Sequence, residues 1–286
     1  MTDGSPLTSP GTPVYEVSVT TSGLDLEVRV NDVPVMRVSG GHVETTFDVN
    51  PHVVTGSNHL GAIVRPPAKT GQYVPQAGAT IVLRVRAAPG SSAVEERGRL
   101  VFEVPQIEAD RAFSGSRTPE GAEPVVAIGT GDIVQARIPV NLLTPFPPWS
   151  WISADQLTDT PEIFDEVLAQ TKTLWGLIQA KDVAALEAAA AEQTKDWRIA
   201  YYLSDDEQAR TMLGIASTLG DPDVQPAPFP DPAGLRLQVL GFGKLARLVD
   251  EEGKDPIVLG VKGVPNMSGR FTALLCRRDG TWSMIR

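Results

Sequence analysis

The chain has 286 residues, of which 42% are hydrophobic and 21% charged, a composition typical of globular proteins rather than disordered ones. Its 25 basic and 35 acidic side chains give a formal net charge of −10, spread along the chain rather than gathered in blocks. Phosphate binding requires clustered Lys and Arg, so neither nucleic acid nor an anionic membrane surface is expected as a partner.

Other features of the sequence exclude further classes of protein and of binding site. No apolar run reaches the ~18–20 residues that span a bilayer. Residues 1–13 have neither the basic start nor the apolar stretch of a secretory signal, and we expect a disordered lead there. Cys276 is the single cysteine, which excludes an intrachain disulfide and a cysteine metal cluster. A cytoplasmic location is expected, and no cofactor is predicted.

Residues 14–144 are predicted to form an all-β antiparallel sandwich. Aliphatic and charged side chains alternate over residues 24–30, the pattern of a strand with one buried face. Turn signals such as Gly40-Gly41 and Pro89-Gly90 separate this strand from others of similar length, and no segment has helical spacing. Further strands are expected over residues 14–19, 45–49, 59–64, 80–87, 99–104, 125–128 and 132–140.

Residues 145–154 are predicted to be a hinge between two domains. Trp149 and Trp151 are two positions apart in this segment, so in an extended chain their rings lie on one side. Two interpretations stay open. The rings form a stacking platform for a ligand or partner, or they pack the two domains together.

Residues 155–286 are predicted to form an α+β domain with three helices on one face of a curved antiparallel sheet. Thr160-Pro161-Glu162 has the capping hydroxyl, proline and acid of a helix start. A second helix is expected from Asp182 toward Tyr202, and a third from Ser204 to Gly220. Strands are expected over residues 235–239, 242–249, 257–261, 271–278 and 281–285.

Both predicted domains carry a family resemblance. The helix Pro161–Ala180, the helix start Lys181–Leu186 and the ending Asp279–Arg286 with its Gly-Thr-Trp resemble the NTF2-like (cystatin-related cone) superfamily. The resemblance implies a cone-shaped domain with a pocket between helices and sheet. Segments Phe47–Pro51 and Gly56–Leu60 are similar to the strand–turn–strand of jelly-roll accessory modules.

If the implied pocket is catalytic, it needs an acid or base. Residues 151–286 contain no histidine, so Tyr201, Tyr202 and Asp196 are the candidates for proton transfer. Trp197 lies four residues before Tyr201, on the same helix face, and is a candidate for binding. The alternative for this aromatic pair is packing in the core.

His52 and His59 flank a turn and are the candidates for a metal site, which needs two or three converging ligands. The alternative is turn chemistry, in which Asn50-Pro51 and Gly56-Ser57-Asn58 close the loop through local hydrogen bonds.

A proline-rich stretch follows the third predicted helix. Residues 222–232 contain five prolines, so they are expected to be extended and stiff. The stretch is either a lid or docking strap anchored by Phe229, or a rigid connector between helix and sheet.

The leading functional hypothesis is a non-catalytic binding protein that engages a protein partner, a basic one given the acidic excess. One alternative is an isomerase- or hydrolase-like enzyme that uses the pocket of the C-terminal domain. A second alternative is a carbohydrate-binding β-sandwich module. Pairing of exposed strand edges between two chains would give a homodimer.

Overall fold

The structure is a computed structural model in which contacts group the chain into two compact units, residues 1–148 and 149–286. Residues 1–10, most of the predicted lead, lie outside the described residues. The structure describes residues 11–68, 70–74, 76–103, 116–117, 125–128 and 133–285, with backbone alone at 116–117, 125–128 and 265–267.

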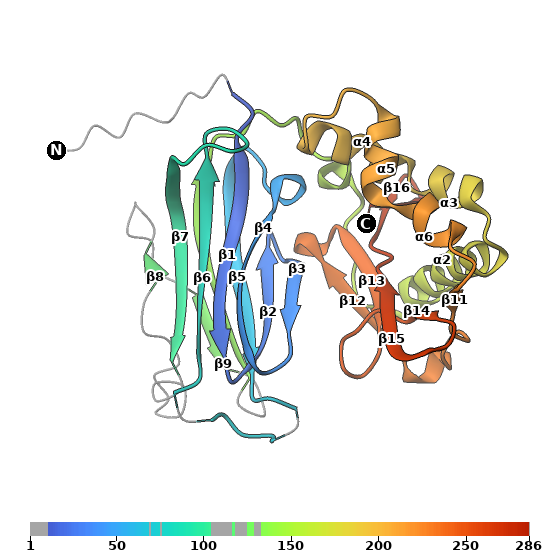
Figure 1. Ribbon diagram of the computed structural model, residues 1–286, viewed down its shortest axis with the longest axis horizontal. Coiled ribbons are helices and arrows are strands. Elements are labelled where there is room, and N and C mark those ends of the chain that lie inside the picture. Colours follow the sequence, from blue (N-terminus) through green and yellow to red (C-terminus); the bar gives the residue numbers. More distant parts are fainter. Residues whose placement is uncertain are drawn as a thin grey trace. The chain divides into compact units, whose positions relative to one another are not determined.

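The described residues of the N-terminal unit form two five-stranded antiparallel sheets (Figure 1). One sheet has the order β4-β1-β6-β7-β8 and the other β3-β2-β5-β10-β9. The strands are β1 (Val14–Ser22), β2 (Asp25–Val30), β3 (Val33–Val38), β4 (His42–Asp48), β5 (Gly56–Arg65), β6 (Gly78–Arg86), β7 (Val94–Glu103), β8 (Ser116–Arg117), β9 (Val125–Ile128) and β10 (Val134–Leu142), with a 3-10 turn η1 (Asn50–His52) before β5.

The two sheets pack face to face through their apolar sides. Leu26, Val28 and Val30 of β2 are buried, as their alternation with charged residues predicts. Gly98 of β7 lies against β10 of the other sheet: a Cβ atom there would be 2.9 Å from Cγ2 of Val140. The sheets are therefore close enough at this point to require glycine.

The described residues of the C-terminal unit form five α-helices and two further antiparallel sheets, ordered β11-β14-β15 and β12-β13-β16-β17 (Figure 1). The helices are α2 (Pro161–Ala180), α3 (Val183–Ala189), α4 (Ala191–Ala200), α5 (Asp206–Leu213) and α6 (Ile215–Gly220). The strands are β11 (Val224–Pro226), β12 (Arg236–Leu240), β13 (Leu245–Val249), β14 (Ile257–Val261), β15 (Val264–Phe271), β16 (Leu275–Arg278) and β17 (Thr281–Met284), with 3-10 turns η2 (Ser150–Ser153), η3 (Pro232–Gly234) and η4 (Gly241–Gly243).

The mixture of helices and antiparallel strands confirms an α+β fold, but the predicted number of helices is wrong. The second predicted helix is divided at Ala190, which has the non-helical angles φ −89° and ψ 11°. The third is divided at Gly214, whose φ of +70° is left-handed and ends α5. The spacing of apolar residues does not reveal such single-residue breaks, because the same three- and four-residue spacing continues on both sides of them.

The single curved sheet was also a wrong prediction. Residues 272–274 interrupt the expected strand 271–278 and divide it between the two sheets. The strand expected from residue 242 begins at Leu245, because η4 precedes it with three consecutive positive φ angles. Gly243 has a φ of +86°, a left-handed conformation that favours glycine.

The core of the C-terminal unit lies between α2 and the strands. The Thr160 hydroxyl accepts a hydrogen bond from the amide of Ile163 and caps α2, as predicted. One face of α2 is buried, through Ile163, Val167, Thr171, Leu174 and Ile178. None of the helices in the described part of the chain is long and apolar enough to cross a membrane.

Candidate functional site: a small apolar pocket in the C-terminal unit

A pocket of about 230 Å³ opens in the C-terminal unit between α2, the junction of α3 and α4, and strands β16 and β17. The residues that line it are Gln170, Leu174, Ala188, Ala189, Ala191, Glu192, Leu275, Trp282, Ser283 and Met284. The alanine-rich sequence of α3 and α4 explains why space remains, because side chains of one carbon cannot reach the strands opposite.

The floor of the pocket is apolar. Leu174, Leu275 and Met284 are buried within the same hydrophobic cluster that fills the unit's core. Trp282 of β17 is half-buried and packs against that cluster. An apolar group that enters the pocket would therefore leave water and contact an existing core surface.

Hydrogen bonds fix the ring of Trp282. Its Nε1 donates to Oε2 of Glu166 on α2 over 2.8 Å, and Nη1 of Arg277 donates to the same oxygen over 3.0 Å. The Arg277 guanidinium lies 5.7 Å from the centre of the indole ring and also pairs with Asp155. The indole is thus held from its edge and one face, which keeps the pocket wall in place.

These contacts make the pocket wall sensitive to acid. The hydrogen bond from Trp282, followed by that from Arg277, lowers the pKa of Glu166. A lowered carboxyl pKa means that the contact is present above the ordinary value and is lost as the pH falls through the lowered one. We expect the NMR signal of the Trp282 indole N–H to titrate with a midpoint below ~4.3, the ordinary value of glutamate. A Glu166→Gln variant should abolish that titration, and a midpoint at or above ~4.3 in the parent would contradict it.

The pocket lining contains few ionisable groups. Among the described residues that line it, Glu192 is the only ionisable one, and it lies 3.9 Å from Arg278. Gln170 and Ser283 are the other polar side chains in the lining. Proton transfer needs an acid or base placed beside the reacting group, generally with a partner that tunes its pKa. Glu192 alone, beside an arginine, does not provide such a pair.

The predicted catalytic residues do not line the pocket. Asp196 of α4 is buried and accepts a hydrogen bond from the Ser150 hydroxyl over 2.7 Å. Trp197 and Tyr201 pack ring against ring, with centroids 5.2 Å apart, and Tyr202 follows α4 with a left-handed φ of 56°. The structure places these residues around the C-terminal end of α4, apart from the pocket lining.

The two tryptophans of the predicted hinge are buried. Trp149 is 1% exposed and Trp151 3% exposed, so neither ring presents an open stacking face. Trp151 packs over Gly241, where a Cβ atom would be 3.4 Å from its Cζ3. Both rings are therefore covered in the structure, and Trp151 packs within the C-terminal unit.

Phe229 fastens the proline-rich segment to α2. Its ring packs edge-on against Trp175 at 5.9 Å, and Nε1 of Trp175 donates to the carbonyl of Ala227 over 3.0 Å. Nζ of Lys172 lies 5.9 Å from the Phe229 ring. Phe229, the residue predicted to anchor a lid or strap, thus holds the proline-rich segment against α2. This arrangement is expected of a rigid connector.

The two candidate metal ligands lie beside a buried asparagine pair. The Asn31 amide donates to the carbonyl of His52, and its Oδ1 accepts from the amide of His59. Burial, followed by the charge of Arg137, lowers the pKa of His59. Within the described ranges, no group of three or more His, Cys, Asp or Glu side chains converges as a metal site would.

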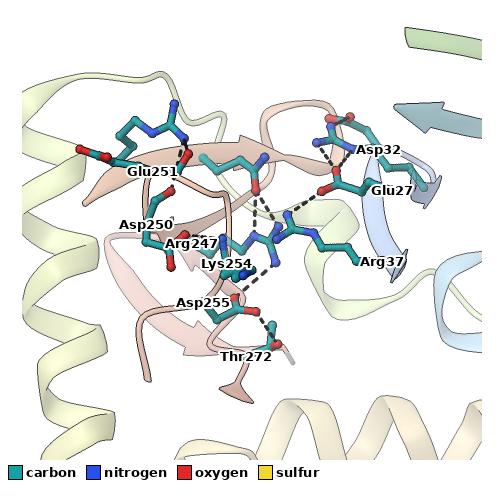
Figure 2. A network of polar contacts seen from close by, with 12 residues as sticks. Glu27, Asp32, Arg37, Arg247, Asp250, Glu251, Lys254, Asp255 and Thr272 are labelled. Carbon is teal, nitrogen blue, oxygen red and sulfur yellow. Dashed lines mark hydrogen bonds and ion pairs between the residues drawn. The ribbon is translucent and has the colours of Figure 1, made fainter. Parts of the chain in front are cut away.

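Charged clusters elsewhere in both units consist of ion pairs (Figure 2). In the N-terminal unit, Glu27 is buried and its two carboxylate oxygens pair with Arg29 and with Arg37. In the C-terminal unit, Asp255 accepts from Nη1 of Arg247 and, over 3.0 Å, from the Thr272 hydroxyl. Partners of opposite charge satisfy these buried carboxylates, so they are typical of structural pairs.

Sequence reasoning missed the pocket residues themselves. Trp282 entered only as part of a resemblance, and Glu166 was not singled out. The alanine run of α3 and α4 is a signal that could have indicated a hollow, since it places small side chains where a helix faces a sheet.

Comparisons with known proteins add nothing to this geometry. No protein-family model, no curated protein and no solved structure matches the chain.

Proposed function

We propose that this chain is a non-catalytic binding protein whose C-terminal pocket holds one apolar side chain of a partner protein. The observation that carries the proposal is the pocket's size together with its lining. A cavity of roughly 150 Å³ lined by aliphatic and aromatic residues is sufficient for benzene. Pockets for drug-sized ligands occupy about 300–1,000 Å³. The volume here, about 230 Å³, falls between the two and suits one leucine, methionine or phenylalanine side chain.

The proposal includes two domains and the families that they resemble. We take the N-terminal unit as a β-sandwich domain and the C-terminal unit as an NTF2-like domain with its pocket between helices and sheet. Two observations support this. Sheets of the N-terminal unit approach closely at Gly98, and the pocket lies between α2 and strands β16 and β17.

The net charge of the C-terminal unit indicates which residues should flank the apolar anchor of the partner. Residues 149–286 carry 14 basic and 20 acidic side chains, a net charge of 14 − 20 = −6. Glu192 in the pocket lining and Glu166 beside its wall are each paired with an arginine, so the attraction comes from the net charge of the whole unit. A partner segment with an apolar anchor flanked by Lys or Arg would be drawn to this surface and oriented on it.

The two alternative functions, an enzyme and a carbohydrate-binding module, require other features. An enzyme needs an ionisable pair in the pocket, and the described lining has Glu192 alone. A carbohydrate module needs an exposed aromatic shelf. Tyr15, Tyr73, Phe102 and Phe146 are buried and Phe47 is half-buried, so no aromatic ring in the described part of the N-terminal unit is fully exposed.

Filling the pocket tests the proposal. Displayed random peptides are selected on the full chain, and the selected peptides are then measured on Ala188→Trp and Ala184→Trp. Both positions are exposed alanines of α3, but only Ala188 lines the pocket. We expect peptides with one apolar anchor and basic neighbours, whose Kd rises at least ~10-fold on Ala188→Trp and is unchanged on Ala184→Trp.

Circular dichroism should show both variants folded. Peptides that bind equally to both variants, or a selection that yields no peptide sensitive to Ala188→Trp, would contradict the proposal.

A further inference from the structure

Strand β4 forms an open edge of the first sheet in the N-terminal unit. It pairs with β1 over seven consecutive residues, from Ser22 opposite His42 to Glu16 opposite Asp48, without a bulge. In the described sheets, β1 is its only neighbour. Exposed and half-buried residues alternate along the whole strand. The backbone groups on its outer side are therefore available to a further strand.

Other edge strands with described side chains are short or irregular. Strands β12 and β17 have five and four residues, and the register of β15 against β14 shifts at Gly260/Val261. Edge strand β3 contains Pro34, and its register against β2 shifts at Val28/Arg29. Edge strand β11 has three residues and ends in Pro226. Proline, bulges and shortness are the usual protections of an edge. Strand β4 has neither proline nor lysine and keeps a regular register.

We propose that β4 pairs antiparallel with β4 of a second copy of this chain, about a two-fold axis at Thr45. In that register His42 lies opposite Asp48, Val43 opposite Phe47 and Glu44 opposite Thr46. Residues directly opposite each other in an antiparallel pair interact on the same face of the sheet. The strand is thus complementary to itself, with a His–Asp pair, an aliphatic–aromatic pair and a Glu–Thr pair on each side of the axis.

The environment of Asp48 favours such a partner. Within one chain Asp48 lies opposite Glu16 of β1, which also pairs with Arg86 of β6. Burial, followed by the like charge of Glu16, raises the pKa of Asp48. In the proposed register His42 of the second copy lies opposite this carboxylate, where a ring N–H can donate a hydrogen bond to it.

The half-buried residues supply the apolar part of the interface. Val43, Thr45 and Phe47 lie opposite Thr21, Val19 and Val17, all of which are buried in the interior of the unit. They stay partly exposed in one chain, where no strand of the described sheets lies beyond β4. Self-pairing would bury them and join the two five-stranded sheets into one continuous sheet.

Charge changes of opposite sign at Thr46 test the register. Position 46 of each copy lies opposite Glu44 of the other, so one substitution changes two pairs. Thr46→Glu creates two pairs of like charge, and Thr46→Lys creates two pairs of opposite charge. Both variants lose the same exposed hydrogen bond to Ser18. In sedimentation equilibrium of the full chain at low salt, we expect the parent to dimerise. The dimer Kd of Thr46→Glu should exceed that of Thr46→Lys by about 5- to 100-fold.

Control variants Thr173→Glu and Thr173→Lys make the same changes in net charge at an exposed position of α2. Their Kd values should agree within about twofold if net charge has no role. Amide hydrogen exchange should slow in residues 42–48 as the protein concentration rises. A parent that stays monomeric to ~100 µM, a Thr46 pair that differs by less than fivefold, or protection located elsewhere would overturn the proposal.

Discussion

Replacing Asn58 by Ala is expected to lower the free energy of unfolding of the N-terminal unit by about 3 kcal/mol, because several buried polar groups lose their partners at once. The Asn58 side chain is fully buried. Its Oδ1 accepts from the Val54 amide and from Asn31, and its Nδ2 donates to the carbonyls of Val54 and Gly56. Alanine provides none of these four bonds.

Two spectroscopic probes separate the effect by unit. All five tryptophans lie between residues 149 and 282, so their fluorescence reports the C-terminal unit. Far-UV circular dichroism reports strands in both units. In urea, Asn58→Ala should shift the dichroism transition of the N-terminal unit and leave the fluorescence transition near its original midpoint. Asn141→Ala, at an exposed position on β10, should change neither by more than ~0.5 kcal/mol. A shift of equal size in both variants would contradict the assigned role.

Leu174→Ala and Ile178→Ala should each lower the free energy of unfolding of the C-terminal unit by about 3 kcal/mol. Both residues are buried on one face of α2, one turn apart. Truncation removes apolar contact and leaves a cavity that the rigid neighbours fill only in part. Tryptophan fluorescence in urea should detect both losses.

The two variants should differ in binding. Leu174 forms part of the pocket floor, whereas Ile178 does not line the pocket. Leu174→Ala should therefore enlarge the pocket and shift the preferred anchor of bound peptides toward larger aromatic side chains. Ile178→Ala, measured under conditions where it stays folded, should keep the parent preference. An identical preference in both variants would mean that the pocket floor does not contact the anchor.

Local sequence patterns predicted the structure correctly where the interactions involved only a few neighbouring residues. Alternation over residues 24–30 predicts a strand with a buried aliphatic face, and β2 has that face. The hydroxyl of Thr160 and the carboxylate of Asp182 predict helix starts, and both side chains accept amide hydrogen bonds there. Asp279-Gly280 predicts the turn between β16 and β17. Each of these signals depends on backbone geometry that neighbouring residues fix among themselves.

The breaks within elements were not predictable in the same way. Gly241, Phe242 and Gly243 adopt positive φ angles, and the Phe242 carbonyl accepts a hydrogen bond from Nε2 of Gln156, 86 positions earlier in the chain. Residues 272–274 leave the strand conformation at the point where the Thr272 hydroxyl bonds to Asp255. Each of these two breaks involves a partner residue that is remote in sequence, so a pattern of neighbouring residues does not predict where the break falls.

By itself the sequence determined the antiparallel strands before residue 145, the helices after residue 160, and the absence of clustered basic charge, since these follow from spacing and composition. Only the tertiary structure decided where a hollow remains. The pocket exists because short alanine side chains of α3 and α4 face Leu275, Trp282 and Met284, from strands about 90 positions later in the chain. A cavity is a volume that several distant segments fail to fill together, and one-dimensional spacing does not encode that volume.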